Sequence, residues 1–414
     1  MEKKVEQYDV VIIGGGAAGL TAGIYCGRAR LKTLLIEKSL VGGLATYTSE
    51  IENYPGFPEG SGGTELMELF HKQAKRFGVK FKLTDVRSVK LEGETKVVET
   101  FRTDYHAKVV IVASGGKPRL TGAAGEDKYL YDKGISFCAT CDAAANTDKT
   151  VLVVGSGDAA IEEGMFLTKF AKKVIVSVMH DEGTMDCNEI AKNQALANEK
   201  MEYVWNTVVE EFKGDDEHLR SVVLKNVKTG ELIDTPVDTC FLFIGYLPNT
   251  EIFKGQLDLT KGGYVLVNER METNMPGVFA AGDVCEKFLK QVATAVGDGA
   301  IAGYAAEKYI AESEIVEHQI LCGGKPRVVY IWNAIDERSR ELLPVFEALE
   351  NNNADDVEVV RVDTYKSNGI ARMLNAPAAP CALLVRDGAV VKQLSCDEIN
   401  AENILTGCGC DTGA

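Results

Sequence analysis

The chain opens with a short apolar run, a glycine-rich turn and a run of small residues. The stretch YDVVIIGGGAAGLTAGIYCGRARLKTLLIEK, residues 8–38, reads as a strand, a turn, a helix, a second strand and a terminal acid. Short continuous apolar runs bounded by turn residues are typical of buried strands in a parallel sheet. The order therefore predicts one half of a dinucleotide-binding fold.

The same pattern returns at KTVLVVGSGDAAIEEGMFLTKFAKKVIVSV, residues 149–178, with a strand over 151–154 and a helix over 159–170. The first fold is not complete at that point. Its remaining strands are VVIVASGGKPR at 109–119 and a strand that ends in Gly282-Asp283, followed by a long helix of small residues. We therefore predict that the second fold is inserted into the first, with crossings near 116–121 and 243–250.

A third pattern follows the short linker LCGGKPR at 321–327. Strand patterns lie at 327–332, 357–363 and 381–394, the last of them a hairpin around Asp387-Gly388. Helix patterns lie at 336–352, 367–375 and 396–407. This βαβαββα order predicts a separate α/β unit. The fold class is thus α/β, with two Rossmann-like dinucleotide-binding domains followed by a third domain.

Length and charge narrow the function classes. A chain of 414 residues is too long for one core, which predicts two to three domains. Its formal net charge of −16 disfavours nucleic acid and anionic membranes as partners, because both bind basic surfaces. No apolar run approaches the roughly 20 residues that span a bilayer, and the N-terminus has no secretory signal pattern. We therefore expect a cytoplasmic protein.

The cysteines point to redox chemistry. Two clusters stand out, Cys138 with Cys141 and Cys408 with Cys410, whereas the scattered cysteines are expected to be small buried hydrophobes. A Cys-x-x-Cys pair in a reducing compartment takes two electrons and passes them on by thiol–disulfide exchange. Asp142 is placed to move a proton to or from the departing thiolate. The alternative, half of a zinc site, lacks a second Cys-x-x-Cys at zinc-finger spacing, so we expect no metal.

The two glycine-rich turns suit dinucleotide phosphates. In the first turn, Gly14 allows the tight turn, Gly16 the approach of a pyrophosphate, and Gly19 the packing of helix on strand. Glu37 is placed to accept hydrogen bonds from a ribose. In the second turn three small residues take the same roles: Gly155, Gly157 and Ala160. Two such folds indicate a flavin and a nicotinamide cofactor, with hydride from the second reducing the first.

Seven motifs occur in a fixed order: GGGAAG, GG-x-x-T-x-x-x-x-IENYPG, CATCD, GSGDAA, IGYLPNT, PGVFAAGDV and KQVATAVGDGAIAG. Over residues 8–318 they closely resemble the low-molecular-weight thioredoxin reductases. The resemblance implies an FAD-dependent pyridine nucleotide-disulfide oxidoreductase, usually a homodimer, whose nicotinamide domain rotates so that nicotinamide and dithiol visit the flavin alternately. It also implies that Cys141 lies nearer the flavin and that Cys138 exchanges with the partner, thioredoxin or a related small disulfide protein.

The resemblance also implies cofactor-binding residues and domain limits. The FAD domain would comprise 1–117 and 248–318, and the NAD(P)H domain with the dithiol would comprise 118–247. The residues implied for FAD are Gly14, Gly16, Ala17, Gly19, Glu37, Lys38, Gly43, Leu44, Thr46, Asn53, Val86, Gly282, Asp283, Lys290, Gln291 and Val292. The residues implied for the nicotinamide dinucleotide are Gly155, Gly157, Asp158 and Ala160.

The residues with which the family binds the 2′-phosphate of NADPH are missing from this chain. In place of a His-Arg-Arg run and a further Arg, the chain has Val178, Met179, His180 and Thr184. Asp181 and Glu182 stand nearby, and a carboxylate suits a free ribose hydroxyl but repels a phosphate. We therefore predict NADH over NADPH, with Asp181 near the ribose. The alternative is another donor, as in relatives fed by ferredoxin or a deazaflavin, although the GSGDAA motif is intact.

The third domain, residues 325–406, resembles thioredoxin in the order of its elements, with Pro380 as the cis-proline. The Trp-Cys-x-x-Cys of thioredoxin is replaced by IDERS at 335–339. Cys381, just after Pro380, would then face an empty site. We therefore expect this domain to lack thioredoxin chemistry at its usual place and to serve as a docking module.

The end of the chain, GCGCDTGA at 407–414, is expected to be a flexible tail because its glycines free the backbone. A mobile Cys408/Cys410 dithiol would collect electrons from Cys138 and carry them to the acceptor, helped by a tethered concentration of roughly millimolar. The alternatives for this pair are binding of a soft metal or no role. For the whole protein, the alternative to a reductase is a slow-turnover redox sensor whose third domain binds a target.

Overall fold

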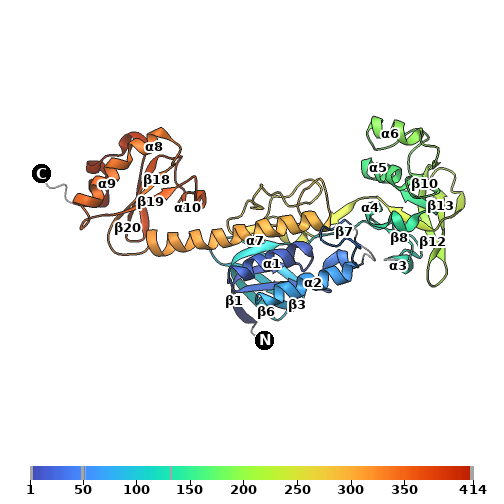
Figure 1. Cartoon of the computed structure of the whole chain (residues 1–414), viewed down its shortest axis with the longest axis horizontal. Helices are drawn as coiled ribbons and strands as arrows, with labels where there is room; N and C mark the ends of the chain where they lie inside the picture. The colour runs from blue at the N-terminus through green and yellow to red at the C-terminus, as the bar shows by residue number, and fades with distance from the viewer. Residues whose placement is uncertain (1–2, 48–50, 52, 131–132, 411–414) are drawn as a thin grey trace. The chain divides into compact units, whose positions relative to one another are not determined.

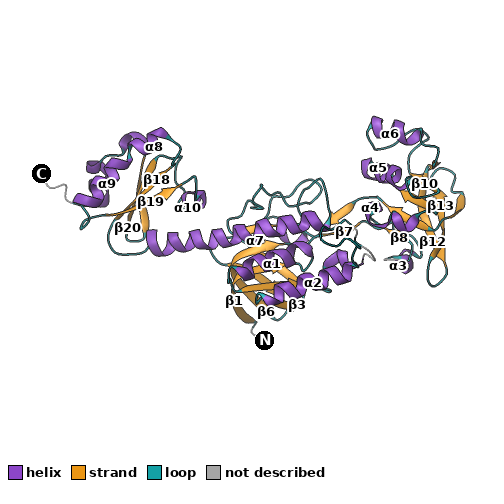
Figure 2. Ribbon diagram, in the orientation of Figure 1, coloured by secondary structure: helices purple, strands orange, loops and turns teal. Residues whose placement is uncertain are grey.

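The computed structural model describes residues 3–47, 51, 53–130 and 133–410. The chain divides into two compact units, Met1–Tyr304 and Ala305–Ala414, and each is described by itself. Helices and strands alternate along most of both units (Figure 2). Among the described residues, no helix combines the length and the apolar character needed to cross a membrane.

The first unit contains a seven-stranded sheet in the order β3-β2-β1-β6-β5-β4, with β17 paired to β6 (Figure 1). The pairs among β1, β2, β3, β6 and β17 are parallel, whereas β4 and β5 form an antiparallel hairpin beside β6. The strands are β1 (Lys4–Ile13), β2 (Thr33–Glu37), β3 (Lys80–Leu83), β4 (Val86–Lys90), β5 (Lys96–Thr100), β6 (Thr103–Val112) and β17 (Val278–Ala280). The apolar runs predicted from the sequence are the buried ends of β1, β2 and β6.

Helices α1 (Ala17–Arg28), α2 (Gly63–Arg76) and the first half of α7 (Val292–Ile315) complete this fold, with short turns η1 (Gly43–Tyr47) and η3 (Glu251–Phe253). Small residues let α7 approach α1 closely. A Cβ atom on Gly299 would lie 2.2 Å from the carbonyl oxygen of Ala18, and one on Gly303 would lie 2.7 Å from the Cβ of Tyr25. The small-residue pattern of the long helix is therefore a packing requirement.

The chain leaves this sheet after β6 and forms a second, five-stranded sheet before returning to it at β17. The order of the second sheet is β11-β10-β9-β15-β8, and a three-stranded antiparallel sheet follows β11. The strands are β8 (Ile135–Ser136), β9 (Thr150–Val154), β10 (Lys173–Val178), β11 (Met201–Trp205), β12 (Thr207–Gly214), β13 (Leu219–Asn226), β14 (Leu232–Pro236) and β15 (Thr239–Leu242). Its helical segments are α3 (Glu126–Tyr129), α4 (Ala139–Asp142), η2 (Ala144–Asn146), α5 (Asp158–Leu167) and α6 (Glu189–Leu196).

The two chain crossings lie side by side. Strand β7 (Gly116–Pro118) on the outgoing segment pairs antiparallel with β16 (Tyr246–Pro248) on the returning segment. These strands fall in the two ranges expected for the crossings. The interrupted order of the first sheet is thus the one that the sequence predicts.

The second unit contains a four-stranded sheet in the order β19-β18-β20-β21. Its strands are β18 (Arg327–Trp332), β19 (Glu358–Asp363), β20 (Cys381–Arg386) and β21 (Ala389–Leu394). Its helical segments are η4 (Val316–Ile320), α8 (Glu337–Glu341), α9 (Leu343–Asn352), α10 (Asn368–Met373), η5 (Cys396–Glu398) and α11 (Ala401–Cys408). β18 and β19 are parallel and the other pairs are antiparallel. The predicted strands are confirmed, the predicted helix over 336–352 is two helices, and the Ala379–Pro380 peptide bond is cis as expected.

The expectation of a flexible tail from residue 407 is wrong for residues 407–410. Gly407 and Cys408 form the last turn of α11, and Cys408 is only 2% exposed in the core that β18, α9 and β20 share. A Cβ on Gly407 would lie 2.3 Å from the Cδ1 of Leu384, so this glycine permits close packing of the helix on the sheet. Gly409, with φ of 75°, ends the helix, and the Cys410 N–H donates to the Leu405 carbonyl at 2.9 Å. Residues 411–414 lie outside the described residues.

Candidate active site

The first glycine-rich turn has the shape that a bound pyrophosphate needs. Gly14 has φ of +110°, and a Cβ there would lie 2.2 Å from the Ala113 carbonyl oxygen. A Cβ on Gly19 would lie 2.0 Å from the Gly14 carbonyl oxygen, so α1 packs directly on the turn. Near Gly16, in contrast, the closest atom to such a Cβ is the Gly42 carbonyl oxygen at 3.9 Å. The turn is therefore tightly packed at Gly14 and Gly19. It is open at Gly16, where the N-terminus of α1 could receive a phosphate.

Glu37 lies at the end of β2 beside this turn. Its Oε2 accepts a hydrogen bond from the Gly15 N–H at 2.7 Å, and its Oε1 accepts one from the Ser39 N–H at 2.9 Å. The two amides fix the carboxylate, and each oxygen retains a lone pair for a further donor. A ribose hydroxyl is a donor of the required kind.

Asp283 supplies the strongest sign of a polar ligand in this fold. Its Oδ1 is buried and has no hydrogen-bond partner among the described residues, and burial raises the pKa of its carboxyl group. The preceding Gly282 has φ of +82°, and its N–H donates to Asp298 at 3.0 Å. A buried acceptor without a donor destabilises the fold, so a ligand hydroxyl at this position would satisfy it. These residues fit FAD.

The remaining residues expected to bind FAD lie around the same fold. Gly43 and Thr46 belong to one short turn, in which the Thr46 hydroxyl donates to the Gly43 carbonyl at 2.7 Å. Leu44 of that turn is 38% exposed. Ala17 and Val292 begin α1 and α7, and Val86 begins β4. The side chains of Lys38 and Lys290 contact Asp85 at 3.9 Å and the Tyr264 ring at 4.1 Å, respectively.

The Cys-x-x-Cys pair is a disulfide between Cys138 and Cys141. Cys138 precedes α4, and its N–H donates to the Ser136 hydroxyl oxygen at 3.2 Å. The Ser136 hydroxyl donates to Asp142 Oδ2 at 2.5 Å, so one serine links the amide of the first cysteine to the carboxylate after the second. Asn146 also holds this segment, donating to the Asp142 carbonyl at 2.8 Å. Asp142 is therefore linked through Ser136 to the amide of Cys138.

Two residues expected near the flavin meet the dithiol segment. Asn53 Nδ2 donates to Gln291 Oε1 at 3.1 Å, and Gln291 Nε2 donates to the Thr140 hydroxyl at 3.5 Å. The Thr140 hydroxyl lies 3.4 Å from the Cys138 sulfur. A continuous chain of polar contacts therefore runs from the first fold to Cys138.

The second glycine-rich turn repeats the first. Gly155 has φ of +126°, and a Cβ there would lie 2.6 Å from the Phe243 carbonyl oxygen, whereas nothing lies within 4 Å of a Cβ on Gly157. Ala160, in the first turn of α5, is fully buried. Asp158, at the start of α5, accepts from the N–H and side-chain amide of Asn188 at 2.7 and 2.8 Å, which ties it to the segment before α6.

A second acid at this turn, Asp186, is one that the sequence reasoning missed. Asp181, expected near the ribose, binds the Lys228 side chain, and this contact lowers the pKa of Asp181. Asp186 instead lies at the turn, where Oδ2 accepts from the Ser156 hydroxyl at 3.1 Å and is 2.9 Å from His180 Nε2. The hydrogen bond with His180 lowers the pKa of Asp186. Only its place in an acidic loop after β10 distinguished it in the sequence.

Two cysteines of the second unit, Cys381 and Cys408, are buried. Burial raises the pKa of both Cys408 and Cys381 to about 11, so both remain thiols at neutral pH. The Cys408 and Cys410 sulfurs lie 4.0 and 3.5 Å from the carbonyl oxygens of Arg327 and Asp356, and the two cysteines form no disulfide.

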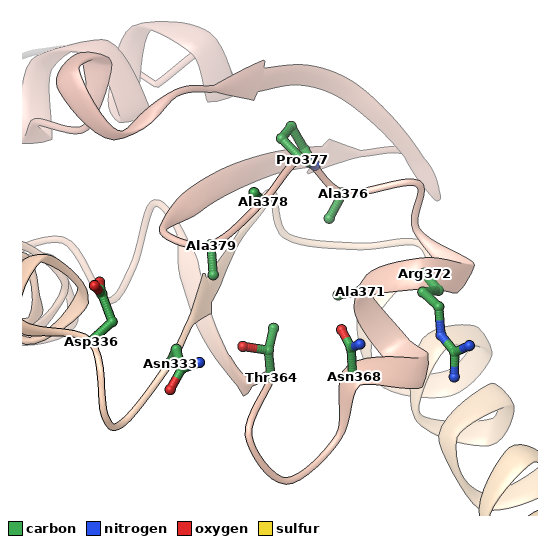
Figure 3. A pocket seen from close by; sticks show the side chains of 10 residues that line it. All are labelled: Asn333, Asp336, Thr364, Asn368, Ala371, Arg372, Ala376, Pro377, Ala378 and Ala379. Atoms are coloured by element: carbon green, nitrogen blue, oxygen red, sulfur yellow. The ribbon is translucent and has the colours of Figure 1, made fainter. Parts of the chain in front are cut away.

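A pocket of about 430 Å³ opens beside the cis peptide of this unit (Figure 3). The expectation that Cys381 faces it is wrong, because Cys381 is 1% exposed and its sulfur donates to the Pro377 carbonyl at 3.5 Å. Figure 3 shows the Arg372 guanidinium extending away from the alanines of the loop. The lining residues are Asn333, Asp336, Thr364, Asn368, Ala371, Arg372, Ala376, Pro377, Ala378 and Ala379.

Comparison with known proteins gives consistent results. A family model described as pyridine nucleotide-disulphide oxidoreductase matches residues 8–299. The chain is 43% identical over 309 residues to a thioredoxin reductase of Peptoclostridium acidaminophilum, covering 73% of this chain and 97% of that protein. It is 40% identical over 311 residues to a thioredoxin reductase of Bacillus subtilis, covering 75% and 96%. A solved thioredoxin reductase of Streptococcus pyogenes has a TM-score of 0.69 and 39% identity, covering 74% and 98%.

Proposed function

Because the chain belongs to the thioredoxin reductases, a family of FAD-dependent disulfide oxidoreductases, we propose that it reduces thioredoxin or a related small disulfide protein with electrons from NADH. The observation that supports this most is the Cys138–Cys141 disulfide, linked through Thr140 to Gln291 of the first fold. FAD, when bound, supplies two-electron transfer between the nicotinamide and the disulfide. We also propose, from the resemblance, that the enzyme is a cytoplasmic homodimer.

The chain's own residues account for the exchange step. Reduction of the Cys138–Cys141 disulfide takes two electrons and two protons and leaves two thiols. Asp142, held by the Ser136 hydroxyl, accepts a proton from the attacking thiol and returns it to a departing thiolate. The Cys138 thiolate attacks a sulfur of the partner's disulfide and forms a mixed disulfide. Cys141 then attacks Cys138, which restores the internal disulfide and releases the partner as a dithiol.

NADH is the proposed donor, and steady-state kinetics test this choice. We expect kcat/KM for NADH to exceed that for NADPH by about tenfold or more, equivalent to about 1.4 kcal/mol. The physical reason is that Asp186, fixed at the turn by Ser156, repels a 2′-phosphate, while the segment directly after β10, residues 179–188, contains no arginine. A Met179→Arg/His180→Arg double variant should raise kcat/KM for NADPH and leave the disulfide reaction unchanged.

The reverse preference would overturn the choice of NADH. In that case the exposed Lys228 beside Asp181 is the cation to examine, since it is the side chain that binds Asp181. If neither nucleotide reduces the flavin, the donor is a ferredoxin or a deazaflavin. The open second turn at Gly157 supports a nicotinamide dinucleotide over these donors.

For the second unit we propose a thioredoxin-like docking domain without its own dithiol. The sheet order β19-β18-β20-β21 and the parallel β18/β19 pair support this assignment. Where a thioredoxin would carry its first cysteine, the N-terminus of α8 carries Asp336, whose side chain accepts from the Ser339 N–H. Because Cys408 is a core residue, we propose that electrons leave from Cys138 directly and not through the Cys408/Cys410 pair.

Serine variants of Cys408 and Cys410 distinguish a structural role of each cysteine from a role in electron transfer. Cys408→Ser places a hydroxyl in an apolar core and is expected to lower the free energy of unfolding by about 2 kcal/mol, whereas Cys410→Ser has little effect on stability. Both variants should retain disulfide turnover within about twofold at a temperature where they are folded. Chemical denaturation and steady-state assays measure the two quantities. A stable Cys410→Ser enzyme that has lost disulfide turnover would contradict this proposal and support an electron relay through Cys408 and Cys410.

A further inference from the structure

A half-buried glutamate that the exchange mechanism does not use lies on the helix that packs against the dithiol segment. Glu163 belongs to α5, the helix that follows the second glycine-rich turn and packs against α4. Its Oε2 is buried and has no hydrogen-bond partner among the described residues. The carboxylate accepts one hydrogen bond, from the backbone N–H of Thr140. Since a buried carboxylate with an unsatisfied oxygen is destabilising, its place under the Cys-x-x-Cys segment calls for an explanation.

Thr140, the residue that Glu163 holds, contacts the exchange sulfur. Its hydroxyl oxygen lies 3.4 Å from Cys138 Sγ and accepts a hydrogen bond from Gln291 Nε2 at 3.5 Å. Because Gln291 donates to the oxygen, the hydroxyl hydrogen is available for the sulfur. A hydroxyl that donates to a thiolate stabilises the charged form and favours ionisation.

We propose that Thr140 and Glu163 are positioning residues that set the acidity of Cys138 in opposite directions. The Thr140 hydroxyl favours the Cys138 thiolate, while Glu163 anchors the Thr140 backbone and, when ionised, disfavours the thiolate by its negative charge. Their opposing effects hold the pKa of the reduced Cys138 at an intermediate value. Cys138 is then not permanently a thiolate, but it ionises readily when a partner docks. This inference rests on the proposed role of Cys138 as the exchange thiol.

The surroundings of Glu163 leave few other charges to account for. Burial raises the pKa of the Glu163 carboxyl, the Thr140 amide opposes this, and Glu162 on the same helix adds to the rise. α5 also packs against α6, β9 and β10, and β9 carries no charged residue. The other charged residues on α5 and its neighbours are bound elsewhere: Asp142 to Ser136, Asp158 to Asn188, Glu189 to Lys192, and Lys173 to Glu202.

The test is the pH profile of Cys138 alkylation in the reduced full-length enzyme, with iodoacetamide and peptide-resolved mass spectrometry. Glu163→Gln keeps an acceptor for the Thr140 N–H and removes the charge. The apparent pKa of Cys138 is then expected to fall by about half a unit, which is about a threefold faster reaction at low pH. Glu162→Gln, which removes the same charge from the exposed neighbouring position, should leave the profile near that of the wild type.

Thr140 variants test the opposite effect, the stabilisation of the Cys138 thiolate by the Thr140 hydroxyl. Thr140→Val removes the hydroxyl at constant shape and should raise the apparent pKa of Cys138, while Thr140→Ser restores the donor and should restore the profile. Unchanged profiles in both Glu163→Gln and Thr140→Val, or equal shifts in Glu163→Gln and Glu162→Gln, would overturn the inference. Failure of the proposed function is distinguishable, because it would appear in the wild type as a Cys138–Cys141 disulfide that gains no thiols on NADH reduction.

Discussion

Cys141→Ser enzyme is expected to lose disulfide reduction by about 10³-fold or more while its flavin is still reduced by NADH. The Cys138–Cys141 disulfide joins α4 to the residue before it. Without Cys141 the internal disulfide cannot form, and the mixed disulfide with the partner has no resolving thiol. Stopped-flow absorbance at the flavin band and a steady-state thioredoxin assay measure the two half-reactions separately.

Cys322→Ser is the matched control for this variant. Cys322 is partly exposed, forms no disulfide and lies in the second unit, so its loss should leave both half-reactions unchanged. If the Cys141→Ser enzyme reduced thioredoxin at the wild-type rate, electrons would reach the acceptor by a route that bypasses the dithiol.

We expect the Gly19→Ala protein to purify without flavin. Its free energy of unfolding should fall by about 3 kcal/mol, so that it unfolds at a lower denaturant concentration. A Cβ at this position would lie 2.0 Å from the Gly14 carbonyl oxygen and 3.1 Å from its carbonyl carbon. Relief of this clash moves α1 away from the turn, and the amides of the helix N-terminus move with it. The flavin-to-protein absorbance ratio after gel filtration measures the loss.

Gly23→Ala, one turn along the same helix, is the control for backbone effects. A Cβ there would come no closer than 3.5 Å to its neighbours, the side chains of Val79 and Ile12, which is ordinary contact. Alanine also favours the helix by about 1 kcal/mol relative to glycine, so this variant should keep its flavin and its stability. A flavin-loaded Gly19→Ala enzyme would show that the first turn is not the pyrophosphate site.

Much of the fold could be predicted because its signals are local. Continuous apolar runs predicted β1, β6 and β9. The glycines at positions where a Cβ would clash predicted both turns. The insertion of one fold in the other also followed from the order of motifs. The break between α8 and α9 at Leu342 did not, because the helical spacing of the apolar residues begins at Leu342 itself and α8 carries only polar and charged residues.

Errors arose where the same residue has two physical uses. Gly407 and Gly409 suggested a mobile end, yet one permits contact with Leu384 and the other closes α11 in a left-handed conformation. The sequence pointed to Asp181 and gave no sign of Asp186, because only the folded loop brings Asp186 back to Ser156. Glu163 could not be recognised as special, since its unpaired oxygen depends on how α5 packs.

The central claim is that electrons pass from NADH through the flavin into the Cys138–Cys141 disulfide. An anaerobic titration with NADH, following the flavin absorbance and counting free thiols, tests it most directly. We predict that the wild type takes up about two equivalents per flavin and gains two thiols, whereas Cys141→Ser takes up about one. Uptake of about one equivalent by both proteins, with no thiols gained in the wild type, would contradict the account.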